Sequence, residues 1–196
     1  HELNPKISHR EGIGDLIAEG IGRMHDELGV ENFSVKGMEF AAHDGRVIQG
    51  QGLSYAVANR GADHMYSTML GLEYDGVVDP DGTAGKAEKL IELENRNAIR
   101  DSGIVCAFAL TDYVDEEILE ILLDTDYEHL QEIGARVIEM ERHFNNKRGM
   151  DVTDDRLPYE IPDLEQSIQE YYDLRGWTDR GTVPDDQVSD APQPAD

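Results

Sequence analysis

The sequence has 196 residues, of which 42 are acidic and 17 basic, so its formal net charge is −25. A surface with this charge repels the phosphates of nucleic acids and anionic lipids, which argues against both as partners. The length allows one domain or two small ones around a sizeable core. Only 5 of the basic residues are lysines, and this acidic, lysine-poor composition favours a salt-loving source, where salt screens the charge.

A single cysteine, Cys106, excludes an internal disulfide bond and fits the reducing cytoplasm in which we expect the protein. No apolar run approaches the roughly 20 residues of a membrane span. The start at His1 has no signal-like pattern of charged and then apolar residues, and it indicates a fragment or a processed chain.

Hydrophobic periodicity predicts helices over much of the first half of the chain. Residues 12–29 carry apolar side chains at helical spacing, and the helix is expected to end at Gly29. The glycine-rich residues 31–52 are expected to form a loop with short extended pieces. Residues 53–72 are expected to form two helical pieces that meet at a turn over residues 59–61.

The acidic residues around Gly82 resemble a calcium-binding loop only superficially. If Gly82 were the loop glycine and Glu88 the closing ligand, the first ligand would be Val77, which has no side-chain oxygen. Residues 75–85 are therefore expected to form an ordinary loop.

A polar helix is expected over residues 83–100, with a left-handed cap near Gly103. The apolar run over residues 104–110 should then begin a buried element, whose first backbone N–H groups are free to hold an anion or the polar edge of a ligand. From the residues alone, Cys106 is either a small buried hydrophobe or a cluster ligand whose partner cysteines lie outside this chain.

Further helices are expected in the last part of the chain. Asp115 should cap a helix over residues 116–123, and Asp126 should open a single long helix that runs to residue 144. The apolar face of the long helix is predicted to consist of Leu130, Ile133, Val137, Met140 and Phe144. A last helix over residues 162–174 should turn Leu164, Ile168 and Tyr171 inward.

These elements predict a mainly α fold. We expect a helical domain over residues 1–125 and a carboxy-terminal helical segment over residues 126–184. Residues 185–196 are acidic and poor in large apolar side chains, so this tail is expected to be disordered.

His43 and His64 lie on segments that flank a turn, and two histidines there could serve a site, because histidine is the usual proton-transfer residue. A surface role or a hydrogen-bonded structural role is the simpler interpretation from the residues alone. Glu39 and His43 would share a metal only within a helix, and the surrounding glycines argue against one. His129 and His143 are expected to face solvent.

Five stretches carry a resemblance to a known family. They are residues 10–20, residues 35–40 with Asp44 and Arg46, residues 52–64, residues 101–106, and residues 136–145 followed by Leu157 and Pro158. Together they resemble the carboxy-terminal half of the tungsten- or molybdenum-containing aldehyde:ferredoxin oxidoreductases. Each stretch alone is weakly specific, but their common order over residues 10–181 makes the resemblance strong. It implies the helical domains of that family.

The resemblance implies roles for five residues. Asp101 corresponds to an aspartate that hydrogen-bonds a pterin of the tungsten (or molybdenum) bis-pterin cofactor, with the backbone near Val105 assisting. Cys106 corresponds to the last of four cysteines that hold a four-iron four-sulfur cluster, which passes electrons to ferredoxin. His64 corresponds to a histidine beside the metal that assists proton transfer. His43, also expected to act in catalysis, stands where family members often carry tyrosine.

Other features depart from the family pattern. Tyr66 stands where a basic residue often helps to bind the phosphate of the cofactor. The three other cluster cysteines and the pterin-binding amino-terminal domain are missing from the sequence, so the chain is expected to be inactive alone. The expected partners are the amino-terminal part of the same enzyme, ferredoxin and an aldehyde substrate, with a homodimer as one arrangement of the full enzyme.

Two functional hypotheses stay open. The first is the carboxy-terminal part of an enzyme that oxidises an aldehyde to a carboxylate. The second is a non-catalytic accessory or relic domain that binds a partner subunit. The joint presence of Asp101, His64 and Cys106 favours the first, since a relic has no chemical need for all three.

Overall fold

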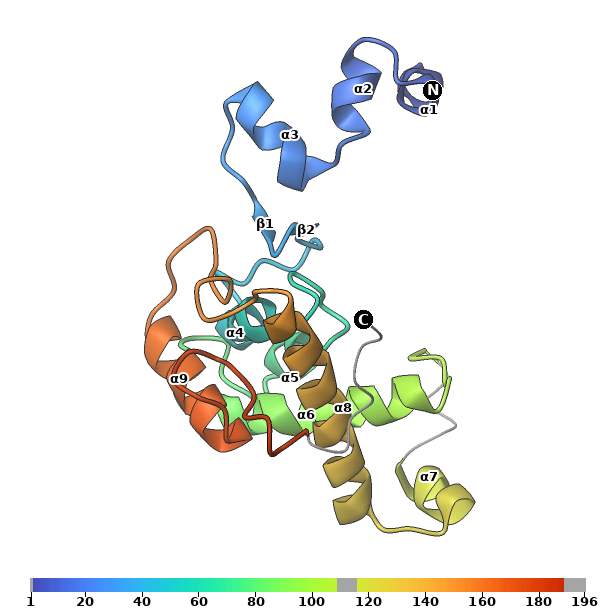
Figure 1. Ribbon diagram of the computed structural model, residues 1–196, viewed down its shortest axis with the longest axis vertical. Helices are drawn as coiled ribbons and strands as arrows, with labels where there is room; N and C mark the ends of the chain where they lie inside the picture. The colour runs from blue at the N-terminus through green and yellow to red at the C-terminus, as the bar shows by residue number, and fades with distance from the viewer. Residues whose placement is uncertain (1, 109–115, 189–196) are drawn as a thin grey trace.

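The computed structural model describes residues 2–108 and 116–188, which form helices joined by loops and one short hairpin (Figure 1). The mainly α class predicted from the sequence is confirmed. The helices are α1 (Leu3–His9), α2 (Ile13–Ile17), α3 (Ile21–Leu28), α4 (Gln49–Val57), α5 (Met69–Tyr74), α6 (Ala87–Ser102), α7 (Glu116–Leu123), α8 (Tyr127–Lys147) and α9 (Leu164–Arg175). The hairpin consists of β1 (Ser34–Val35) and β2 (Met38–Glu39).

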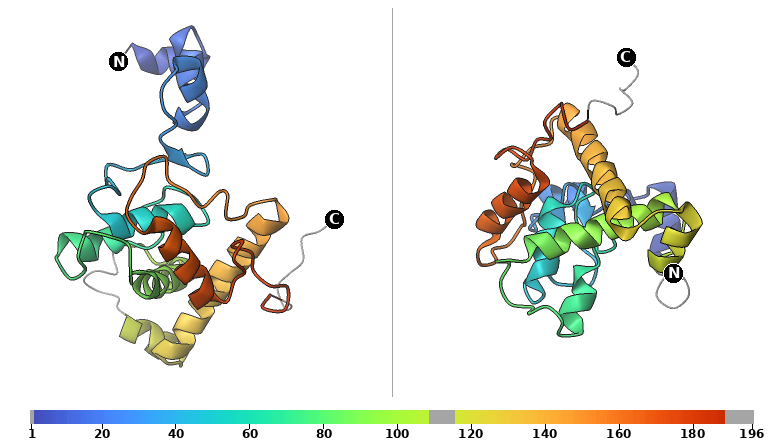
Figure 2. Two further views of the ribbon diagram at one scale, coloured as in Figure 1. Left: turned by 90° about the vertical axis from the view of Figure 1, so that its left-hand side faces the viewer. Right: turned by 90° about the horizontal axis from the view of Figure 1, so that it is seen from below.

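Helices α1 to α3 form an arm that projects away from the rest of the molecule (Figures 1 and 2). The prediction of one helix over residues 12–29 is wrong, because α2 ends at Ile17 and α3 begins at Ile21. Gly20 separates them with φ 78° and ψ 163°, a conformation outside the helical region that glycine adopts readily. The predicted end at Gly29 is confirmed, and this residue takes the left-handed conformation with φ 63°.

The hairpin joins the arm to the body of the molecule. Lys36 and Gly37 both have positive φ, as the two central residues of a tight hairpin turn require. The prediction of a loop with short extended pieces is confirmed for most of residues 31–52. It is wrong at the end of that range, where α4 already begins at Gln49.

Helix α4 lies in the interior, with every residue from Gly50 to Val57 buried. Its amino terminus is capped from α5, because the Glu73 carboxylate accepts hydrogen bonds from the N–H groups of Gly50 (2.7 Å) and Gln51 (2.9 Å). Lys86 Nζ lies 2.9 Å from the same carboxylate and compensates its charge. Two helices, α4 and α5, do occur around the predicted residues 53–72, but the prediction that they meet at a turn over residues 59–61 is wrong, because a loop over residues 58–68 separates them.

The loop between α5 and α6 is an ordinary one, as predicted. The Asp79 side chain accepts a hydrogen bond from the Asp81 N–H at 3.0 Å, which forms a local turn. The polar helix that follows begins at Ala87, later than the predicted residue 83.

Helices α6 and α8 cross where Gly134 of α8 meets Asn95 of α6. A Cβ atom at Gly134 would lie 2.3 Å from the carbonyl oxygen of Asn95, so only glycine permits this approach. The predicted start of α8 is confirmed, since the Asp126 side chain accepts a hydrogen bond from the His129 N–H at 2.9 Å. The long helix is uninterrupted, also as predicted.

The predicted buried face of α8 is largely wrong. The buried residues are Leu130, Gly134, Ile138 and Arg142. In the predicted face, Ile133 is 39% exposed and Phe144 is 52% exposed, while Val137 and Met140 are half-buried. The face that is buried includes a glycine and an arginine. A search of the sequence for apolar residues therefore selects a neighbouring face of the helix instead.

Helix α9 covers the main core with Ile168 and Tyr171 buried and Leu164 packed at the edge, as predicted. Asp115, the predicted cap of α7, lies outside the described residues. So does most of the predicted disordered tail, but Val188 is 3% exposed and belongs to the main core. The domain division near residue 125 stays a prediction. No helix in the described ranges combines the length and apolar character needed to cross a membrane.

Candidate functional site

Asp101 lies in the last turn of helix α6, and Cys106 closely follows the turn that ends this helix. The N–H groups of residues 103–105 donate to the carbonyl oxygens of residues 99–101, at 2.9 to 3.1 Å. The prediction that these N–H groups are free to hold an anion is therefore wrong. Gly103 was expected to take the left-handed conformation, but it has φ −75° and Ile104 has φ 57°. A left-handed isoleucine costs roughly 1–2 kcal/mol, so this turn contains strained backbone.

No residue is buried in the described part of the apolar run after α6, since Val105 and Ala107 are half-buried and the others are exposed, so the prediction of a buried element is wrong. Ile104 is 94% exposed and Phe108 is 85% exposed. Cys106 is a free, exposed cysteine, which excludes its interpretation as a small buried hydrophobe. An accessible sulfur suits a ligand shared with another polypeptide. Within the described ranges, no group of three or more His, Cys, Asp and Glu side chains is arranged to hold a metal ion.

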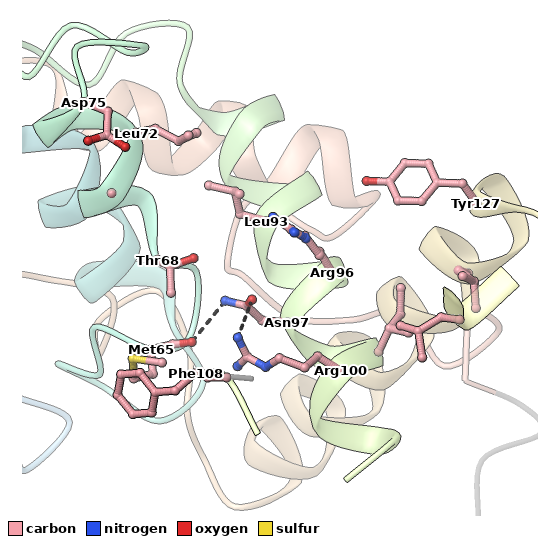
Figure 3. A pocket seen from close by; sticks show the side chains of 15 residues that line it. Met65, Thr68, Leu72, Asp75, Leu93, Arg96, Asn97, Arg100, Phe108 and Tyr127 are labelled. Carbon is pink, nitrogen blue, oxygen red and sulfur yellow. Dashed lines mark hydrogen bonds between the residues drawn. The ribbon is translucent and has the colours of Figure 1, made fainter. Parts of the chain in front are cut away.

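Hydrogen bonds connect Asp101 to the segment that follows His64. Arg100 donates from Nε (3.0 Å) and Nη2 (2.9 Å) to Asp101 Oδ1, and from Nη1 to Asn97 Oδ1 (3.0 Å). Asn97 Nδ2 in turn donates to the carbonyl oxygen of Met65 at 3.1 Å (Figure 3). Arg100 and Asn97 are buried while Asp101 is exposed. The buried pair therefore fixes the exposed carboxylate relative to the loop of residues 58–68.

His43 and His64 meet, although 20 residues separate them in the sequence. Their ring centroids lie 5.1 Å apart with the ring planes inclined by 50°. Nδ1 of His43 lies 3.3 Å from the Tyr74 hydroxyl, and the Tyr55 hydroxyl donates to the His43 carbonyl oxygen at 3.1 Å. Burial raises the pKa of Tyr55, which keeps its hydroxyl protonated as a donor. Tyrosines of α4 and α5 thus position His43 against His64.

The loop that carries His64 is fixed on both sides. The Asp63 carboxylate accepts a hydrogen bond from the Met65 N–H at 2.8 Å and pairs with Arg60 at 3.1 Å. Gly61 has φ 96°, and a Cβ atom there would lie 2.2 Å from the carbonyl oxygen of Val35 in β1. The loop therefore packs tightly on the hairpin, and Asp63 sets the backbone on either side of His64.

A cavity of about 420 Å³ lies beside the bonds from Arg100 to Met65 (Figure 3). Its wall combines polar groups from α6 with apolar side chains, among them Leu72, Leu93, Ile99, Leu119 and Leu130. Met65 and Arg100 line the cavity, but their neighbours His64 and Asp101 do not. The structure thus brings the two predicted segments to one cavity, while the two predicted side chains lie outside its wall.

Tyr66 is part of the interior. Its hydroxyl accepts a hydrogen bond from Asn59 Nδ2 at 2.9 Å and donates to Glu141 Oε2 at 3.0 Å. Burial raises the pKa of Tyr66 well above its ordinary value, so the hydroxyl stays neutral. This tyrosine ties the loop of residues 58–68 to α8.

The sequence alone did not identify Tyr74, Asn97 and Arg100 as parts of this site. A signal existed for Asn97 and Arg100, which lie one turn apart on α6 beside the apolar Leu93 and Ile99. For Tyr74 there was none, because its contact with His43 spans 31 residues. The roles predicted for His43, His64, Asp101, Val105 and Cys106 stay predictions.

Comparisons with known proteins agree with the resemblance seen in the sequence. The family model described as aldehyde ferredoxin oxidoreductase, domains 2 & 3, matches residues 1–190. The chain therefore belongs to the aldehyde ferredoxin oxidoreductase family.

Curated relatives are much longer than this chain. The tungsten-containing aldehyde ferredoxin oxidoreductase of Pyrococcus furiosus is 34% identical, in an alignment that covers 97% of this chain and 36% of the relative. The protein of the same name from Thermococcus kodakarensis is 32% identical, with the same coverage of 97% and 36%. The chain thus spans about a third of the length of these relatives.

A solved structure shows the same fold. The active site complex BamBC of benzoyl coenzyme A reductase, in complex with 1,5-dienoyl-CoA, matches with a TM-score of 0.63 and 18% identity. The match covers 96% of this chain and 37% of that chain.

Proposed function

We propose that this chain is the carboxy-terminal part of an aldehyde:ferredoxin oxidoreductase, which oxidises an aldehyde to a carboxylate at a tungsten or molybdenum pterin. Electrons then pass to ferredoxin through a four-iron four-sulfur cluster. One observation carries the proposal: in a chain of this family, the exposed residues Asp101 and Cys106 flank one turn, and hydrogen bonds connect Asp101 through Arg100 and Asn97 to the segment after His64.

The residues present fit one side of a shared cofactor site. Both hydrogen bonds from Arg100 go to Oδ1 of Asp101. The exposed carboxylate therefore remains accessible, through its other oxygen, to the N–H donors of a pterin. At Val105 the N–H already donates to Arg100, so the carbonyl oxygen is the backbone group able to assist. The exposed sulfur of Cys106 supplies one of the four ligands that such a cluster commonly needs. When bound, the pterin-held metal supplies the two-electron redox chemistry.

The histidine pair suits the proton transfer that this reaction needs. Conversion of an aldehyde and water to a carboxylate releases protons together with two electrons. We assign His64 as the first proton acceptor and His43, whose ring lies against it, as the second. The Tyr74 hydroxyl holds Nδ1 of His43, and this tyrosine is 59% exposed. The pair therefore leads from the loop of residues 58–68 towards solvent.

The test uses a chimeric polypeptide in which this chain replaces the matched part of the Pyrococcus furiosus relative. Purified without air, the chain alone should show no iron–sulfur absorption, whereas the chimera should show it. Cys106→Ala should abolish this absorption in the chimera. The helical circular dichroism should stay unchanged, because the side chain is exposed.

His64→Gln should retain the cluster and lower aldehyde-dependent ferredoxin reduction about 100-fold or more, the usual effect of a proton-transfer residue. His129→Gln is the matched control, because His129 is exposed on α8. A cluster that survives Cys106→Ala, or full activity in His64→Gln, would favour the non-catalytic accessory domain instead.

A further inference from the structure

The arm formed by α1 to α3 exposes apolar side chains that nothing in the described chain covers. Among residues 2–30, only Gly14 is buried. The most exposed apolar side chains of the arm, each 41–55% exposed, are Leu3, Ile13, Ile21, Leu28 and Val30. The arm contacts the rest of the molecule mainly through α3 and β2.

The polar side of the arm, in contrast, has partners of its own. Arg10 forms ion pairs with Asp15 and Glu19, and Arg23 lies 3.7 Å from Glu19. These pairs connect the three short helices to one another. The arm thus combines paired polar side chains with the uncovered apolar side chains named above, which we call its apolar side. This combination is typical of helices that pack against another body.

The arm is also anchored at a defined place. The Ile21 N–H at the start of α3 donates to Glu39 Oε1 of β2 at 2.7 Å. A Cβ atom at Gly22 would lie 3.1 Å from the carbonyl oxygen of Gly37, so α3 approaches the hairpin closely. Hydrogen bonds from the backbone lower the pKa of Glu39 and keep it charged as an acceptor. The hairpin therefore sets the direction of the arm, while the apolar side remains free.

Without a cover, the arm lacks the apolar packing on which short helices depend. Helices shorter than about 12 residues are marginal in water and depend on packing of an apolar face. The helices of the arm have 7, 5 and 8 residues, and none buries an apolar side chain. Their order therefore depends on a surface that lies outside the described chain.

The family supplies one specific occupant. The matching family model is described as domains 2 and 3, which implies another domain, and about two thirds of the length of each curated relative lies outside the part matched here. A second copy of this chain is a poorer occupant, because it would bring two bodies with a net charge of −25 each together. We infer that the apolar side of α1 to α3 docks onto the remaining, amino-terminal part of the family polypeptide. The choice of partner rests on the proposed function.

Hydrogen exchange tests this inference with the chimera described above. In the chain alone, amides of residues 3–28 should exchange quickly. In the chimera, their exchange should be at least tenfold slower. Ile13→Asp combined with Ile21→Asp places charges on the apolar side and should remove this protection. Val47→Asp combined with Val77→Asp is the matched control, because it introduces the same two charges at apolar residues that are 68% and 70% exposed outside the arm.

The outcomes separate the docking surface from the function. An arm that exchanges quickly in a chimera with cluster absorption and activity would overturn the docking inference and leave the proposed function intact. A protected arm in a chimera without cluster absorption would support the docking inference and overturn the proposed function. If the isolated chain sediments as a dimer and the double variant sediments as a monomer, the occupant is a second copy and the inference is wrong.

Discussion

Asp155 is buried beside two cations from distant parts of the chain. Its carboxylate pairs with Arg142 of α8 at 2.6 Å and with Lys36 of the hairpin at 2.7 Å, and it accepts a hydrogen bond from the Tyr172 hydroxyl of α9. The side chains of Asp155 and Arg142 are fully buried. One carboxylate thus joins the hairpin, α8 and α9.

The charges of this cluster depend on one another. Burial by itself would raise the pKa of Asp155, but the Lys36 charge and the hydrogen bonds from Arg142 outweigh it and lower the pKa below its usual 3.8. Burial lowers the pKa of Lys36, although Asp155 opposes the change. Removing the carboxylate would leave two buried cations unpaired.

Asp155→Asn should therefore lower the free energy of unfolding at neutral pH by about 3–5 kcal/mol, as expected when one partner of a buried pair is removed. Because the pKa of Asp155 is lowered in the folded state, its contribution is present above pH 3.8 and is lost as the pH falls through the folded value. The difference between wild type and variant should shrink below pH 3.8.

Urea unfolding at several pH values measures both effects. Asp185→Asn is the matched control, because it removes an exposed carboxylate paired with Lys147 and should change stability little. Equal effects of the two variants at neutral pH would contradict the role of the buried cluster.

The crossing of α6 and α8 determines how the helices of the body pack. Gly134 lets the two backbones approach, and one turn further Ile138 fills the interface. Arg175 of α9 reaches the same part of α6, where it bonds Asn95 at 2.7 Å and Glu94 at 2.8 Å. Both the tight backbone contact and the buried polar contacts therefore meet at one turn of α6.

Gly134→Ala should destabilise the protein although alanine favours helices. The added Cβ would clash with backbone atoms of Asn95, and overpacking of this kind costs about 1–3 kcal/mol. Gly71→Ala is the matched control, because Gly71 lies in α5 with no neighbouring atom within 4 Å of the new Cβ. The free energy of unfolding of Gly71→Ala should rise by up to about 1 kcal/mol, because alanine favours helices more than glycine does. Thermal unfolding of the two variants measures both effects. Changes of the same sign in the two melting temperatures would contradict the tight contact of Gly134 with Asn95.

Local signals in the sequence predicted helix ends better than helix faces. Asp126 and Gly29 act through bonds to their own helix, so their roles follow from nearby residues alone. The buried face of α8 depends on Gly134 and Arg142, whose places are set by Asn95 and Asp155 on other elements. Ile104 took the left-handed conformation predicted for Gly103, which no local preference explains.

The candidate site shows the same limit. The roles of Asp101, Cys106 and His64 were predicted from family motifs in the sequence. The connecting residues Arg100 and Asn97 left a signal as polar residues beside Leu93 and Ile99, but the bond from Asn97 to Met65 spans 32 residues, and only the three-dimensional structure reveals it.

At the scale of the whole molecule, the outstanding feature is an excess of negative charge over the entire chain. Several of the acidic groups described above are neutralised inside the molecule, as Asp155, Glu73 and Glu94 are by buried cations. The net charge of −25 is left to repel itself. Adaptation to concentrated salt stays a prediction that stability measurements are able to test.

Salt should stabilise this protein by screening the repulsion between its carboxylates. The Debye length falls from about 30 Å at 0.01 M salt to about 3 Å at 1 M. Salt also weakens surface ion pairs, but each of these contributes at most about 1 kcal/mol, and buried pairs are screened less. The free energy of unfolding should therefore rise between 0.01 M and 1 M KCl by about 1 kcal/mol or more, the energy of one close charge contact in water. Urea unfolding at each salt concentration measures the change. A stability that is independent of the KCl concentration would show that repulsion between carboxylates does not limit this fold.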